Sequence, residues 1–294
     1  MLIIRLCGGL GNQMFQYACA QTTALRLGTE LKLDISFLQD RTPREDFTYR
    51  DFELNVFQIN NEIATKKEVQ QFLPYAHNAS APIYGLFLLK RVLRRNYLFR
   101  EPKQKQFQHI SAIDKLQDDS YIQGYFQSEK YFVPQKNEIL KAFALKNKID
   151  FQNQQLIDKI SAENAVSIHI RRGDYQHKAN SHFNLLDISY YLKAIDLIRA
   201  KIENPVFYIF TEDHEWAKKQ FEHFTIVNIN KGEQSHMDMI LMSCCKHNII
   251  ANSSFSWWGA WLNRNEEKIV IAPQKWFADG RKTYDLIPTN WIKL

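Results

Sequence analysis

The sequence has little cysteine, and none of it lies in a pattern that binds a metal or builds a disulfide framework. The four cysteines are Cys7, Cys19, Cys244 and Cys245, and they show no CxxC or Cys/His spacing. Each lies inside an apolar segment, so we expect four buried thiols in a reducing compartment. This pattern favours neither a structural zinc site nor a disulfide scaffold.

Long hydrophobic runs are also missing. No apolar stretch approaches the roughly 20 residues that cross a bilayer, and residues 1–6 are too short for a signal-peptide core. The sequence therefore predicts a cytoplasmic protein whose first residues form a strand. Residues 83–95 join an apolar block to basic side chains, which favours either an interior helix with snorkelling lysines and arginines or a weak peripheral contact with the inner membrane face.

Acidic residues are in the minority, with 32 Asp and Glu against 38 Lys and Arg and a net charge of +6. A positive balance favours an anionic partner, such as nucleic acid, a phospholipid surface or a phosphorylated small molecule. The chain has no aromatic-basic platform and no groove-entering motif, so we predict no nucleic-acid binding. It also lacks HExxH and a strand-flanked DxD, which predicts that no metal and no cofactor is required.

The first half of the chain begins with a strand, a glycine loop, a helix and a second strand. The strands are expected over residues 2–6 and 30–35, and the helix over 14–27 ends at Gly28, which suits the left-handed position after a helix. A further strand is expected within residues 120–127. Such a βαβ start is typical of a doubly wound sheet.

The second half repeats this alternation more regularly, with its clearest helix over residues 187–201. Strands are expected over 165–170, 206–210, 225–227, 248–251 and 268–271. A polar interval over 146–162 separates the two halves. We therefore predict an α/β fold in which two Rossmann-like domains, 1–150 and 151–294, face a central cleft.

The strongest functional signal is an apolar strand that ends in Arg171, Arg172, Gly173 and Asp174. Ligands of open α/β sheets lie beyond the carboxyl ends of the strands. Two guanidinium groups at that place suit a diphosphate, because each presents a rigid fork of donors. The alternative is a surface salt-bridge cluster with Asp174.

Polar side chains follow two more of the expected strands. Glu212 and Asp213 follow one, where a carboxylate either accepts the two N–H groups of a guanine edge or caps a helix. Ser253 and Ser254 follow the other, at a helix start where hydroxyls and backbone amides form an uncharged phosphate cradle. Trp258 and Trp261, which come after them, are expected in the core.

The glycine loop contains Gly8, Gly9 and Gly11, but it matches neither GxGxxG nor a phosphate-binding loop with its lysine. It indicates either a close approach of the backbone to an anion at the helix start or a tight turn with helix–sheet packing. Asn12 and Gln13 begin this helix. We expect their amides to point into the cleft rather than to cap the helix.

Five segments together resemble the bacterial α1,2-fucosyltransferases of glycosyltransferase family 11. They are GGLGNQMFQYA at 8–18, QGYFQSEKYF at 123–132, HIRRGDY at 169–175, FTEDHEW at 210–216 and ANSSFSWWGAWLN at 251–263. The resemblance implies a GT-B-like fold, GDP-β-L-fucose as donor, inversion at the anomeric carbon and no required divalent metal. It also implies a galactose-terminated glycan as acceptor.

The resemblance also implies roles for individual residues. Arg171 is the foremost pyrophosphate ligand, and Asn12 reaches the fucose–phosphate junction from the first domain. The donor-binding set is His169, Arg171, Arg172, Glu212, Asp213, Ser253, Ser254, Phe255, Gly9 and Gly11. Within it, His169 and Asp213 face the nucleoside end, and which of Glu212 and Asp213 binds guanine is left open. The acceptor-binding set is Gln123, His177 and His182.

The general base is left open as well. Asp174 is favoured because it lies closest to the phosphate arginines, but an ion pair with Arg172 would lower its pKa and make it a poor base. His177 and His182 titrate in the right range, and a reaction without a dedicated base is a further alternative. Together with the polar strand ends, the resemblance implies transfer of fucose to the 2-hydroxyl of a terminal galactose in a glycan or lipid-linked precursor. The alternative is a non-catalytic GDP-sugar- or glycan-binding protein.

Overall fold

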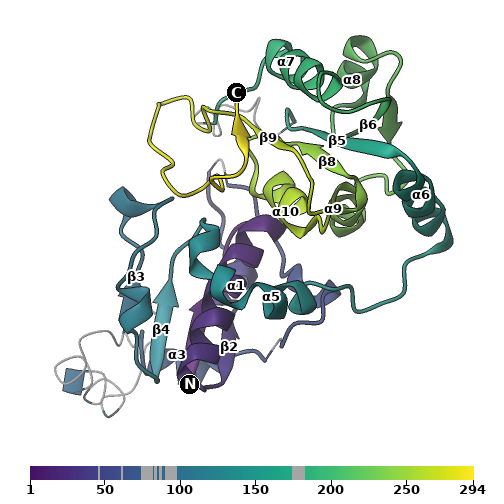
Figure 1. Cartoon of the computed structure of the whole chain (residues 1–294). Coiled ribbons are helices and arrows are strands. Elements are labelled where there is room, and N and C mark those ends of the chain that lie inside the picture. The colour runs from purple at the N-terminus through teal and green to yellow at the C-terminus, as the bar shows by residue number, and fades with distance from the viewer. Residues whose placement is uncertain are drawn as a thin grey trace. The chain divides into compact units, whose positions relative to one another are not determined.

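The computed structural model describes residues 1–45, 47–60, 62–73, 82, 85, 88–89, 98–173 and 183–294. These residues form two compact units (Figure 1). Unit 1 comprises Met1–Lys146 and Thr283–Leu286, and unit 2 comprises Asn147–Lys282 and Ile287–Leu294. The chain therefore leaves unit 1 after Lys146 and returns to it briefly near the carboxyl end.

Unit 1 contains a four-stranded parallel sheet in the order β2-β1-β4-β3. Its strands are β1 (Leu2–Arg5), β2 (Leu31–Asp34), β3 (Leu98–Arg100) and β4 (Ser120–Gln123). Its helices are α1 (Leu10–Leu27), α2 (Ser36–Gln39), α3 (Lys66–Gln70) and α5 (Lys136–Ala142). All strand pairs are parallel, so the four carboxyl ends lie at one edge of the sheet.

Helix α1 begins earlier than its sequence predicts and ends where it was expected. Its first residue is Leu10, because Gly9 in extended backbone serves as the N-cap. Gly28 adopts φ 61°, the left-handed conformation that closes a helix, and its N–H bonds back into the last turn. Met14 and Phe15 are fully buried, so α1 packs into the core of unit 1.

Unit 2 contains a six-stranded parallel sheet in the order β10-β9-β8-β5-β6-β7. Its strands are β5 (Asn164–Ile170), β6 (Pro205–Thr211), β7 (Thr225–Val227), β8 (His247–Ile249), β9 (Val270–Ala272) and β10 (Ile292–Lys293). Its helices are α6 (Phe151–Ala162), α7 (Ile188–Arg199), α8 (His214–Gln220), α9 (Ser235–Cys244) and α10 (Ser254–Leu262).

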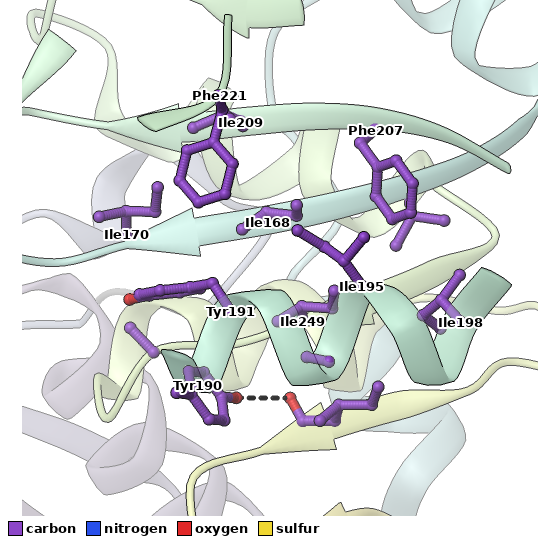
Figure 2. Close-up of a cluster of buried hydrophobic side chains, with 14 of the residues drawn as sticks. Ile168, Ile170, Tyr190, Tyr191, Ile195, Ile198, Phe207, Ile209, Phe221 and Ile249 are labelled. Atoms are coloured by element: carbon purple, nitrogen blue, oxygen red, sulfur yellow. Dashed lines mark hydrogen bonds between the residues drawn. The ribbon is translucent and has the colours of Figure 1, made fainter. Parts of the chain in front are cut away.

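Strand β5 is buried on both faces, and its side chains point alternately toward the helices on either side of the sheet. Val166, Ile168 and Ile170 pack into the apolar cluster that α7 completes (Figure 2). The intervening residues face the opposite side, where Ser167 accepts from Asn248 at 2.7 Å and His169 lies against Phe255 of α10. Helices therefore cover both faces of the sheet, and the α/β prediction of two Rossmann-like units in a GT-B-like fold is confirmed.

The expectation that all four cysteines are buried is wrong for two of them. Cys19 and Cys245 are buried, whereas Cys7 and Cys244 are only partly covered, and all four are free thiols. Cys7 lies just after the carboxyl end of β1, and Cys244 is the last residue of α9, so neither lies in the middle of a packed element. Among the helices of the described residues, none combines the length and apolar character that crossing a bilayer requires.

Candidate functional site

The sheet of unit 2 reverses its strand order beside β5. The chain runs from β5 to β6 and β7 on one side, and then continues on the other side with β8, β9 and β10. Strand β5 pairs with both β6 and β8, so the residues that follow these three strands gather at one edge. The carboxyl edge at such a reversal is the usual ligand site of an open α/β sheet.

Arg172 is held by unit 2 itself. Its Nε lies 3.2 Å from Oδ2 of Asp213, and its guanidinium lies 4.3 Å from the centre of the Trp216 ring. The other oxygen of Asp213 accepts the backbone N–H of Trp216 at 3.2 Å and caps α8. The helix-capping alternative for Asp213 is therefore confirmed. The sequence did not indicate the stacking on Trp216.

Glu212 organises the loop that follows β5. Its Oε1 accepts the backbone N–H groups of Arg172 at 3.0 Å and Gly173 at 2.8 Å, and it lies 3.7 Å from Nε of Arg171. Gly173 permits this approach, because a Cβ there would lie 2.8 Å from Cγ of Glu212. One carboxylate thus fixes both the backbone of the arginine loop and the direction of Arg171.

His169 is a buried, neutral imidazole at the same edge. Its pKa is lowered to about 3, first because burial disfavours the charged ring and second because Arg171 is positive. Within the described part of the chain, its Nδ1 has no hydrogen-bond partner. A buried ring nitrogen without a partner is costly and calls for an explanation.

The amino terminus of α10 contributes the third component of this edge. Ser253 is its N-cap, and its Oγ accepts from the N–H of Phe255 at 3.3 Å. No acidic residue occupies the first turn, so the positive end of the helix dipole is not offset there. Trp258 and Trp261 are buried, as the sequence predicts, and the neighbouring Trp257 is fully buried as well, so the helix is fixed to the core.

The glycine loop of unit 1 is stabilised from within the chain. Gly8 has φ 76°, and a Cβ there would lie 2.6 Å from Nδ2 of Asn12. Glu53 accepts the N–H of Leu10, so a carboxylate of the protein lies at the start of α1. Gln13 is fully buried and donates to the carbonyl oxygens of Gly8 and Asp51, each at 2.8 Å.

The expectation that Gln13 points its amide into a cleft is therefore wrong. The backbone of the segment beside the glycine loop needs hydrogen-bond partners, and the Gln13 amide supplies them. Asn12 is partly exposed, and its Oδ1 accepts from Nε2 of Gln127 at 2.6 Å. The donor-binding roles of Gly9, Gly11 and Asn12 stay predictions.

A pocket of about 620 Å³ lies at the carboxyl edge of the unit 1 sheet. Its lining includes the last residue of every strand, namely Arg5 of β1, Asp34 of β2, Arg100 of β3 and Gln123 of β4. Gln123 was expected at an acceptor site. The other three were not predicted. Arg5 and Asp34 lie at the ends of expected strands, which was the signal used for Arg171, whereas Arg100 ends a strand that was not expected.

Three predicted residues, Asp174, His177 and His182, lie outside the described residues, as does most of 83–95. The described ranges contain no group of three or more His, Cys, Asp or Glu side chains that could hold a metal ion. The predictions of a metal-free reaction and of a base in the arginine loop therefore stay predictions.

Comparison with known proteins gives a consistent assignment. The model of "Glycosyl transferase family 11" matches residues 1–294. The O-antigen biosynthesis glycosyltransferase WbnK of Escherichia coli is 37% identical over 305 residues, which covers 98% of this chain and 99% of that protein. The alpha-1,2-colitosyltransferase of Escherichia coli is 33% identical and covers 100% and 99%.

More distant matches include galactoside 2-alpha-L-fucosyltransferase Sec1 of Mus musculus, which is 25% identical and covers 89% of this chain and 64% of that protein. Among solved structures, fucosyltransferase NodZ from Bradyrhizobium aligns with a TM-score of 0.47 and 14% identity, over 88% of this chain and 92% of that one.

Proposed function

The chain belongs to glycosyl transferase family 11 and is a glycosyltransferase, and from this premise we propose that it transfers L-fucose from GDP-β-L-fucose to the 2-hydroxyl of a terminal galactose. The acceptor is a glycan or a lipid-linked glycan precursor. Unit 2 binds the nucleotide sugar, and unit 1 binds the acceptor. The fucosyltransferase relative in mouse supports the choice of sugar and of hydroxyl.

The observation that carries this proposal is the carboxyl edge of the unit 2 sheet. Arg171, the unpartnered Nδ1 of His169 and the amino terminus of α10 share that edge at the strand-order reversal. All three are suited to an electron-rich nucleotide diphosphate, and none requires a metal. The ion pair of Arg172 and Asp213 lies at the same edge.

Arg171 has the role of stabilising the leaving group. When the bond between the sugar and the diphosphate breaks, negative charge grows on the β-phosphate, and a guanidinium that is already oriented stabilises it without reorganisation. Glu212 supplies this orientation through its contact with Nε. Inversion places the acceptor hydroxyl on the opposite face of the sugar, where a base accepts its proton. Asp174, His177 and His182 remain the candidates for that base.

GDP-colitose is a second candidate donor, because a relative that is 33% identical over the full chain is a colitosyltransferase. Colitose is L-fucose without its 3-hydroxyl. A site that hydrogen-bonds the 3-hydroxyl of the sugar rejects the deoxy sugar strongly, whereas a site with an apolar surface there does not. Comparing kcat/KM for GDP-fucose and GDP-colitose with one acceptor decides between the two donors.

The test of the proposal measures GDP release and glycan product from GDP-fucose and lactose. We expect acceptor-dependent release in the native protein, a loss of roughly 100-fold or more in kcat/KM for Arg171→Ala, and poor rescue by Arg171→Lys. Arg264→Ala is the matched control, since Arg264 is an exposed arginine of the same unit. Donor binding without acceptor-dependent release would favour the alternative of a non-catalytic GDP-sugar-binding protein.

A further inference from the structure

The pocket of unit 1 contains two arginines whose charge is not matched inside the described chain. Among the described residues, neither Arg5 nor Arg100 makes a hydrogen bond or an ion pair. The third arginine of the pocket, Arg44, pairs with Asp40. The pocket therefore presents guanidinium groups that the protein itself leaves available.

The one remaining carboxylate of the pocket is already engaged. Asp34 is 3% exposed, and its oxygens accept from the Tyr121 hydroxyl at 2.6 Å and from the Ser36 N–H at 2.9 Å. Asp34 stands beside Arg5 in the register of β1 and β2, but no ion pair joins them. With Arg44 offset by Asp40, Arg5 and Arg100 outnumber Asp34, so the pocket has a net positive charge.

Arg5 is also positioned in advance of any ligand. Its guanidinium lies 4.7 Å from the centre of the Phe37 ring, and its side chain is partly buried. A guanidinium held over an aromatic face loses less freedom when it binds. The pocket volume of about 620 Å³ lies within the range of small-molecule sites.

We propose that this pocket binds an anionic group of the acceptor, a carboxylate or a phosphate, through the guanidinium groups of Arg5 and Arg100. The proposal rests on the proposed function, because it assigns a chemical class to the acceptor of that reaction. Two sources supply this chemistry: an acidic sugar next to the terminal galactose, and the phosphate that links a glycan to a lipid. Both offer the planar or tetrahedral oxygen pairs that a guanidinium fork matches.

The test measures equilibrium binding of three soluble probes to the full chain in the absence of donor. All three carry the same galactose-terminated disaccharide: one is neutral, one continues into glucuronic acid, and one ends in a short alkyl diphosphate. We expect one or both anionic probes to bind about tenfold or more tightly than the neutral probe. Arg5→Gln and Arg100→Gln should each remove most of that difference and leave binding of the neutral probe unchanged.

Arg41→Gln is the matched control, because Arg41 is an exposed arginine of unit 1 that pairs with Asp51 and does not line the pocket. It removes the same charge and should leave the difference intact. Arg100 is exposed, so its replacement tests the proposal even where Arg5→Gln unfolds the protein. Equal binding of the three probes, binding of none, or an equal effect of Arg41→Gln would each overturn the proposal.

Transfer assays with the same probes and GDP-fucose separate this inference from the proposed function. Transfer to all three probes at equal affinity overturns only the anionic pocket. Anion binding that depends on Arg5 and Arg100 without any transfer overturns only the assigned reaction. A preference for the glucuronic acid probe indicates an acidic glycan, and a preference for the diphosphate probe indicates a lipid-linked one.

Discussion

Replacing Gly173 by Ala should disable the arginine loop through Glu212. The added Cβ would lie 2.8 Å from Cγ of Glu212, which is closer than real Cβ atoms come, and 3.0 Å from Oε1, which is tighter than most real Cβ contacts. The Glu212 side chain must therefore move. When it moves, the N–H groups of Arg172 and Gly173 lose their acceptor, and Arg171 loses the carboxylate at its Nε.

The expected cost follows from these contacts. A hydrogen bond to a charged group contributes about 1.5–3 kcal/mol, but the Glu212 side chain is 34% exposed, and water replaces part of what is lost. We therefore expect a loss of about 1–2 kcal/mol in the free energy of unfolding, which corresponds to roughly 2–8 °C in Tm for a unit of this size. The rate should suffer more, by about tenfold in kcat/KM, because Arg171 is no longer oriented.

Tryptophan fluorescence during urea unfolding is a suitable assay, because all six tryptophans belong to unit 2 and report on that unit alone. Glu212→Ala should cost about as much as Gly173→Ala, since both remove the same contacts. The double variant should then be no worse than either single variant. Glu233→Ala, at an exposed carboxylate of unit 2, controls for the change of charge.

Additive losses in the double variant would refute this reasoning, because they would show that Gly173 and Glu212 act through separate contacts. An unchanged Tm and an unchanged kcat/KM for Gly173→Ala would refute it as well. In that case the loop would tolerate the methyl group without moving Glu212.

Three more expected outcomes concern His169, Gly9 and the need for a metal. The pKa of His169 is lowered to about 3, so between about pH 6.5 and pH 3 the unfolded chain binds a proton that the folded chain does not. This group therefore makes the free energy of unfolding fall as the pH is lowered through that window, by up to about 1.4 kcal/mol per pH unit. Urea unfolding of His169→Gln across pH 4–7 should show a shallower pH dependence, and an identical slope would exclude the effect. Gly9→Ala should lower Tm only slightly, because alanine is a poorer N-cap than glycine but its Cβ would meet nothing closer than 3.8 Å. It should raise KM for GDP-fucose if the donor approaches the backbone as predicted. An unchanged KM would remove Gly9 from the donor site. Transfer should continue at the full rate in EDTA, and activity lost to the chelator and restored by Mg²⁺ or Mn²⁺ would contradict the metal-free reaction.

The sequence predicts the long elements and the places where strands end, because these depend on local pattern. Strand β7 and the left-handed Gly28 agree with prediction in full. Strand β3 and strand β10 were missed, since each is a short edge strand whose pairing depends on a partner far along the chain. Local pattern cannot show such long-range pairing.

The same limit applies to the site. Arg171 and the α10 start could be located from the sequence, because each follows an apolar strand. The role of Glu212 could not, since it depends on a loop that precedes it by some forty residues and on the missing Cβ of Gly173. The buried Gln13 was misjudged for a similar reason, because its partners at Asp51 and Glu53 come from a distant irregular segment.

The return of Thr283–Leu286 to unit 1 has a consequence for the order in which the protein is made. Asp285 accepts from the Lys130 ammonium group at 2.6 Å and from the His109 backbone N–H at 2.8 Å, so these two donor groups lack this acceptor until the last part of the chain has been synthesised. Domains generally fold in sequence order as they leave the ribosome. Unit 1 departs from that order, because residues 1–146 emerge first but complete their contacts only when Thr283–Leu286 has been made. A fragment that stops at Lys146 would never complete these contacts.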